Sequence, residues 1–160
     1  MDENDLIVSK TDLTGRITYA NDVFLRIARL SEGQTVGAPH SLIRHPDMPR
    51  AVFKVLWDTI KAGDEIFAYV NNLAADGANY WVFAHVTPSF GADGAVIGYH
   101  SNRRAPERRV LPFIMETYAR LKAEENRHAS RSAGLEASSR LLGDLLREKG
   151  MPYDEFIFSL

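Results

Sequence analysis

The chain of 160 residues contains no cysteine. This absence excludes a disulfide framework, a thiolate nucleophile, a cysteine-ligated zinc or iron–sulfur site, and photochemistry that uses a cysteine. An apolar run of the roughly 18–20 residues that a membrane span needs is also missing, and the first ten residues, MDENDLIVSK, lack the apolar core of a signal peptide. We therefore expect a cytoplasmic protein without a membrane span.

The sequence has no excess of basic residues, because 19 lysines and arginines face 21 aspartates and glutamates, with a formal net charge of −2. A nucleic-acid surface requires a dense basic stripe, so we expect no nucleic-acid partner. A clustered nucleophile and base, or a paired-carboxylate motif, is also missing from the sequence. The chain is therefore expected to have no catalytic residues, and an enzyme is the less favoured class of protein.

Four of the five histidines, His40, His45, His85 and His100, are spread over separate segments. Together they could form a metal or haem site, but scattered histidines on half-polar strands are more often hydrogen-bonded surface groups. We expect no metal site, and haem is less favoured than other cofactors.

An amphipathic helix is the strongest local pattern, and it ends at Lys61-Ala62-Gly63. Its apolar residues recur at helical spacing: Val52, Phe53, Leu56, Trp57 and Ile60. The hexapeptide RHPDMP at 44–49 precedes the helix, and its two prolines predict a defined elbow. Asp47 stands where an N-cap residue belongs.

The first 104 residues otherwise alternate between strand and turn patterns. A hairpin is predicted around Asp12–Gly15, a helix after Asn21, and three strands at 66–73, 80–88 and 96–102. This order predicts an α+β fold, in which short helices cover one face of a five-stranded antiparallel sheet. We take residues 1–104 as one domain.

Residues 105–160 are predicted to form a helical extension, with apolar residues at helical spacing in 110–121 and 135–146. The tail 153–160 is apolar enough that it must dock, either on its own chain or on another subunit or protein. The arginines that precede these helices are either a solvated junction or a contact patch for an acidic partner. These arginines are Arg103, Arg104, Arg108 and Arg109.

Several short motifs follow one another in a fixed order between residues 6 and 104. They include ITYAND at 17–22, RHPDMP at 44–49, Asp76-Gly77, Tyr80-Trp81-Val82 and Gly98-Tyr99. In this order and spacing they resemble a PAS domain, specifically the N-terminal PAS domain of bacterial aerotaxis receptors. The resemblance implies a PAS fold and a non-enzymatic sensory or interaction module, whose pocket between sheet and short helices holds FAD non-covalently.

The resemblance also implies a set of cofactor-binding residues in this sequence. Ile66 stands where these receptors carry a tryptophan, so one aromatic contact to a flavin is missing. Each residue also has a structural alternative: Asn21 and Asp47 could only cap helices, His45 could bond local backbone, and the tryptophans could belong to the core. The predicted cofactor-binding residues are Asn21, Arg44, His45, Asp47, Trp57, Ile66 and Trp81.

These observations lead to a functional hypothesis. The chain is expected to sense redox or energy state, or the occupancy of its pocket. It would relay this signal through its C-terminal helices to a protein partner, such as a histidine kinase or a chemotaxis or motility component. The same helices are expected to form a homo-oligomer. The alternative is a ligand-free PAS scaffold that only dimerises and binds partners.

Overall fold

The computed structural model describes residue 2 and residues 4–160, and the chain divides into two compact units. Unit 1 consists of Met1–His45 and Thr59–Pro106, and unit 2 consists of Pro46–Asp58 and Glu107–Leu160. The units differ from the predicted domains by assigning residues 46–58 to the second part. The domain division at residue 104 stays a prediction.

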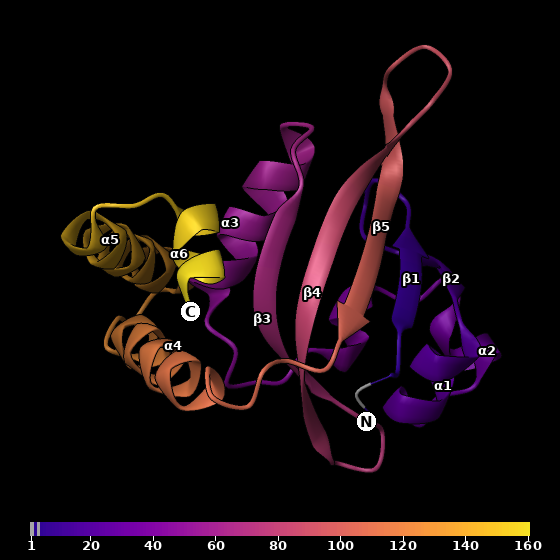
Figure 1. Cartoon of the computed structure of the whole chain (residues 1–160), viewed down its shortest axis with the longest axis horizontal. Coiled ribbons are helices and arrows are strands. Elements are labelled where there is room, and N and C mark those ends of the chain that lie inside the picture. The colour runs from indigo at the N-terminus through magenta and orange to yellow at the C-terminus, as the bar shows by residue number, and fades with distance from the viewer. Residues whose placement is uncertain (1, 3) are drawn as a thin grey trace. The chain divides into compact units, whose positions relative to one another are not determined.

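A five-stranded sheet forms the centre of unit 1 (Figure 1). Its neighbouring strands are all antiparallel, in the order β2-β1-β5-β4-β3. The α+β fold with an antiparallel sheet is therefore confirmed. The strands are β1 (Ile7–Thr11), β2 (Ile17–Ala20), β3 (Ile66–Leu73), β4 (Asn79–Phe90) and β5 (Val96–Arg104).

The short helices of unit 1 lie between β2 and β3 in the sequence. They are α1 (Asp22–Ala28), α2 (Glu32–Thr35) and the 3-10 helix η1 (His40–Ile43). Helix α1 begins where it does because the side chain of Asn21 accepts the backbone N–H of Phe24 at 2.9 Å. The same oxygen accepts the N–H of Val8 at 3.0 Å, and the Asn21 amide donates to the Leu6 carbonyl at 2.9 Å. Asn21 therefore joins α1 to the first strand.

The strand register defines two faces of the sheet. Directly paired residues share a face, so one row contains Ile7, Arg103, Ala84 and Ala68, all buried. We call this the inner face, since Phe24 of α1 packs its ring 5.1 Å from the Arg103 guanidinium. The outer face carries the alternate residues, among them Phe67, His85 and Asn102.

Gly98 fixes a close approach between β1 and β5. A Cβ atom at this position would lie 2.4 Å from the carbonyl oxygen of Thr11, far inside van der Waals contact. Any side chain here would push the two strands apart, so the glycine is required by the sheet itself.

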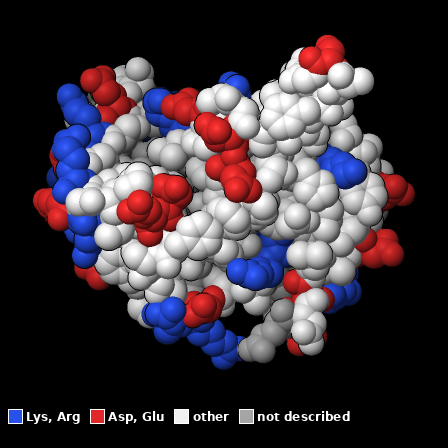
Figure 2. All heavy atoms as spheres, turned by 45° about the horizontal axis from the view of Figure 1, so that its top comes forward, with Lys and Arg blue, Asp and Glu red and all other residues white. Residues whose placement is uncertain are grey.

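Four helices contribute to unit 2: part of α3 (Arg50–Lys61), α4 (Leu111–Asn126), α5 (Arg131–Lys149) and α6 (Tyr153–Ser159). Pro112 lies in the first turn of α4, where its missing N–H costs no helical bond. None of the described helices combines the length and apolar composition required to cross a membrane. On the face in Figure 2, basic and acidic side chains are interspersed.

The apolar tail forms helix α6, which was not predicted from the sequence. Phe156 and Ile157 are 3% and 2% exposed, and the ring centroids of Phe113 and Phe156 lie 6.1 Å apart. Arg109 donates to the carbonyl oxygen of Leu160 at 2.6 Å. The tail therefore docks on its own chain, as one of the two predicted alternatives required.

Candidate functional site

A buried polar chain runs across the inner face of unit 1. Arg103 on β5 donates through Nη2 to the hydroxyl of Ser9 on β1, and Ser9 Oγ lies 3.1 Å from Nε2 of His40. The Phe24 ring contacts the first and the last residue of this hydrogen-bonded series. It lies next to the Arg103 guanidinium and edge-on to the His40 ring, with ring centroids 6.3 Å apart. Four segments that are far apart in the sequence thus converge on this point.

The surroundings of His40 favour its neutral form. Ser9 accepts from Arg103, and which of the Ser9 hydroxyl and His40 Nε2 donates in their contact depends on the tautomer of His40. Burial, followed by the charges of Arg103 and Arg44, lowers the pKa of His40 from 6.5 to about 3. His40 is therefore a neutral imidazole at physiological pH.

Arg103 is a buried cation whose charge meets no carboxylate among the described residues. Its side chain is 3% exposed, and among residues 2 and 4–160 its Nε and Nη1 atoms have no hydrogen-bond partner. Burial lowers the pKa of Arg103 to about 10, so the guanidinium remains charged at neutral pH. An arginine in this state has two strong donors available for a bound molecule.

Other donors line the same face towards β3. Nδ2 of Asn72, a residue 3% exposed, has no hydrogen-bond partner within the described part of the chain. Tyr80 lies directly opposite Asn72, and burial raises the pKa of its phenol to about 12. Arg44 forms an isolated antiparallel bridge with Asn72, and burial lowers the pKa of Arg44. The inner face therefore offers donors and positive charge, suited to a ligand with acceptor atoms.

Four of the predicted site residues lie in unit 1 near this face. Asn21 caps α1, and whether it only caps or also contacts a cofactor stays a prediction. The N–H of His45 donates to the Asn71 carbonyl at 3.3 Å, next to the Arg44 bridge. Ile66 is 5% exposed and pairs with Val86 on β4, so it belongs to the inner face.

The three remaining predicted residues are one residue on the outer face of the sheet and two residues of unit 2. Trp81 pairs with Asn71, and alternation along β4 directs it to the outer face, opposite Tyr80. Asp47 and Trp57 belong to unit 2. Helix α3 begins at Arg50, which leaves Pro49 in the N-cap position, and Asp47 is exposed. Cofactor contacts of these three residues, and capping by Asp47, stay predictions.

The histidines do not converge on a metal. Within residues 2 and 4–160, no three histidine, aspartate or glutamate side chains are placed to hold an ion. His85 lies 2.6 Å from Glu65, and His100 lies 3.1 Å from Asn102. The histidine ligands required by the metal or haem alternative are therefore dispersed over both faces of the sheet.

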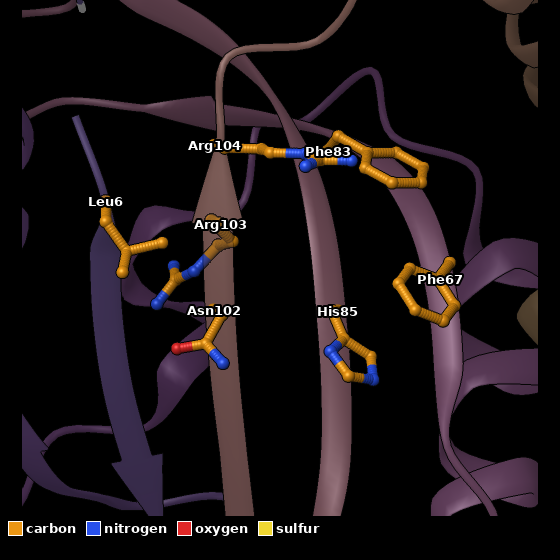
Figure 3. A pocket seen from close by; sticks show the side chains of 7 residues that line it. All are labelled: Leu6, Phe67, Phe83, His85, Asn102, Arg103 and Arg104. Atoms are coloured by element: carbon orange, nitrogen blue, oxygen red, sulfur yellow. The ribbon is translucent and has the colours of Figure 1, made fainter. Parts of the chain in front are cut away.

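The outer face carries a separate pocket of about 260 Å³ (Figure 3). The rings of Phe67 and His85 stack in parallel with centroids 4.1 Å apart, and the Arg104 guanidinium lies 5.4 Å from the centre of the Phe83 ring. Arg103 also borders this pocket, but its guanidinium is directed towards β1 in Figure 3, where it bonds Ser9. The pocket wall consists of Leu6, Phe67, Phe83, His85, Asn102, Arg103 and Arg104.

Three residues of the inner face, Ser9, Asn72 and Tyr80, were not predicted as site residues from the sequence. Both predicted alternatives for the arginines, a solvated junction and a contact patch for an acidic partner, are wrong for Arg103, because alternation along β5 turns its side chain inward while Arg104 stays exposed. No local signal in the sequence separates Arg103 from Arg104, and the pairing of Arg103 with Ala84 of the inner row appears only in the register of β4 and β5.

Comparisons with known proteins agree with this architecture. Residues 17–103 match the family described as PAS fold. The chain is 34% identical over 121 residues to the aerotaxis receptor of Escherichia coli K12, covering 76% of this chain and 24% of the receptor. It is 27% identical over 104 residues to a nitrogen fixation regulatory protein of Klebsiella pneumoniae, covering 65% of this chain and 21% of that protein. The chain thus spans less than a quarter of these relatives.

Solved structures show the same fold at low sequence identity. A PAS domain from Colwellia psychrerythraea superposes with a TM-score of 0.58 and 19% identity, covering 63% of this chain and 86% of the other. A light-oxygen-voltage domain studied with a flavin analogue superposes with a TM-score of 0.59 and 18% identity, covering 77% of this chain and 87% of the other.

Proposed function

Because this chain belongs to the PAS family, we propose that it is a non-catalytic sensor and interaction module of bacterial signal transduction, located in the cytoplasm. The observation that carries the proposal is the 34% identity with an aerotaxis receptor over 121 residues, which is longer than the family match at 17–103. The relatives are named as a receptor and as regulatory proteins, and sensing is the function that we propose they share with this chain.

We further propose that the ligand is a flavin, with FAD as the first candidate. The inner face fits the acceptor-rich edge of a flavin ring, because Arg103 and Asn72 offer unused buried donors. A bound flavin would supply electron transfer, which makes redox or energy state the proposed stimulus. Haem is less favoured, since it requires an axial ligand and Nε2 of His40 is already engaged in a hydrogen bond with Ser9.

The signal is proposed to pass through the C-terminal helices to a protein partner, such as a histidine kinase or a component of chemotaxis or motility. Exposed apolar side chains support an interaction role for α4, because Met115 is 51% exposed and Phe113 is 37% exposed. The same helix is the proposed contact in a homo-oligomer.

An absorption spectrum of the purified full chain tests the flavin proposal. The expected result is flavin absorbance in the blue that stays with the protein through gel filtration and is released, as FAD, on denaturation. A colourless protein that also fails to bind added FAD would contradict this proposal. It would favour a ligand-free scaffold, in which Ser9 and Phe24 alone accommodate Arg103.

The oligomer is tested by sedimentation of the full chain over a range of concentrations. Met115→Asp is expected to shift the wild-type oligomer to monomer, because it replaces an exposed apolar side chain of the proposed contact with a charged one. Glu116→Gln, at the neighbouring exposed position, serves as the control and is expected to leave the oligomer intact. A wild-type protein that is monomeric at every concentration would contradict the proposed contact.

A further inference from the structure

The charge balance of the inner face points to one residue as the ligand anchor. Within the described part of the chain, the ion pairs join other residues, and the Arg103 guanidinium bonds the Ser9 hydroxyl and lies over the Phe24 ring. A buried charge without a counter-charge is costly and persists where another function retains it.

We infer that Arg103 anchors a negatively charged or carbonyl acceptor group of the ligand, and so determines which ligands this module accepts. The inference deepens the proposed function and rests on it for the existence of a ligand. Ser9 fixes the guanidinium by taking Nη2, which leaves Nε and Nη1 for the ligand. Asn72 supplies a further buried donor on the same face.

His40 contributes by staying neutral. A protonated His40 would add a second cation beside Arg103. The neutral ring instead forms a hydrogen bond with the Ser9 hydroxyl, whose oxygen accepts from Arg103. His40 and Ser9 are therefore positioning residues, while Arg103 and Asn72 are the proposed ligand contacts.

The change in stability of the ligand-free protein when Arg103 is replaced distinguishes a ligand anchor from a residue that stabilises the fold. If Arg103 serves the ligand, replacement by a similarly long apolar side chain removes an uncompensated buried charge and does not weaken the ligand-free fold. If Arg103 serves the fold, the same replacement lowers stability because the contacts with Ser9 and Phe24 are lost.

The test compares wild type, Arg103→Met, Arg103→Lys and Arg104→Met as full chains freed of ligand. Arg104 is the matched control, since it is the next residue of β5 and is exposed. Binding of FAD and of the dicarboxylate malate is measured by titration, and thermal unfolding is measured without ligand. We expect Arg103→Met to bind about 10- to 100-fold more weakly than wild type, to melt at the same or a higher temperature, and Arg103→Lys to recover part of the binding.

Two outcomes would overturn the anchor: wild-type affinity in Arg103→Met, or a melting temperature of ligand-free Arg103→Met below that of wild type and Arg104→Met. A different outcome would contradict the flavin proposal without contradicting the role of Arg103. If wild type binds malate but not FAD, and Arg103→Met loses the malate response, then FAD is the wrong ligand and the anchor stands.

Discussion

The carboxylate of Glu125 on α4 accepts the backbone N–H of Ala51, in the first turn of α3, over 3.1 Å. The same carboxylate accepts from Arg50 Nε at 3.1 Å and from Ser138 Oγ at 3.0 Å, and its side chain is fully buried. Glu125 thus satisfies an N–H at the start of α3 from a distant helix, a task that usually falls to a neighbouring side chain.

Glu125→Ala is expected to lower the free energy of unfolding by about 2–4 kcal/mol, because it leaves the Ala51 N–H and the Arg50 guanidinium without their acceptor. Denaturant unfolding measures the change. Glu136→Ala is the control on α5, since Glu136 is 70% exposed in its pair with Arg140 and should change stability by no more than about 0.5 kcal/mol. Equal effects of the two substitutions would show that the buried network adds nothing.

Stability is expected to depend on pH through His40. Its pKa is 6.5 in the unfolded chain and about 3 in the fold, so the unfolded state binds more protons between these values. The contribution is therefore fully present above pH 6.5 and is lost as the pH falls towards 3. Between about pH 7 and pH 5 the free energy of unfolding is expected to fall by about 1–2 kcal/mol through His40.

His40→Gln should flatten this part of the pH profile, because glutamine can still form a hydrogen bond with Ser9 but does not titrate. Urea unfolding at several pH values provides the measurement. An unchanged slope in His40→Gln would assign the pH dependence to other groups.

Gly98→Ala is expected to cost about 1–3 kcal/mol, because the added methyl group would lie 2.4 Å from the Thr11 carbonyl oxygen. Gly33→Ala in α2 is the matched control, since a Cβ atom added there would meet nothing within 4 Å. There the substitution should be neutral or stabilise the fold by up to about 1 kcal/mol. Thermal unfolding of both variants is the measurement. A lower melting temperature in Gly98→Ala alone would show that the close approach of β1 and β5 requires glycine at position 98.

Docking of the tail gives a further comparison. Phe156→Ala should lower stability by about 3–5 kcal/mol, because this ring is 3% exposed and packs near Phe113. Phe158, two positions later in α6, is 62% exposed, and its replacement by alanine should change stability by no more than about 0.5 kcal/mol. If both variants unfold like wild type, the tail does not dock on its own chain in solution.

The sheet was well predicted from the sequence because its signals are local. Turn residues such as Asp12 and Gly94 mark the hairpins, and apolar alternation marks the strands that they join. The elbow before α3 was equally visible, since proline restricts the backbone wherever it stands.

The buried polar chain was not predictable in this way, because it depends on pairing between distant strands. Arg103 becomes an inner-face residue only when β5 lies beside β1, which brings Ser9 within reach. Along the sequence, Arg103 is one of several neighbouring arginines, and nothing local separates it from the exposed Arg104. The contact of Glu125 with Ala51 in α3 was hidden because the two residues are 74 positions apart in the sequence.

The pairing of β1 with β5 also has a consequence for synthesis of the chain on the ribosome. Ile7 lies opposite Arg103, so the first strand made is completed by the last strand of the sheet. Until β5 emerges, the β1–β2 hairpin has a bare edge, and the donors and acceptors of β1 face solvent or other chains. Long-range pairing of this kind forms slowly, so the unpaired edge of β1 is a site at which aggregation competes with folding until β5 is made.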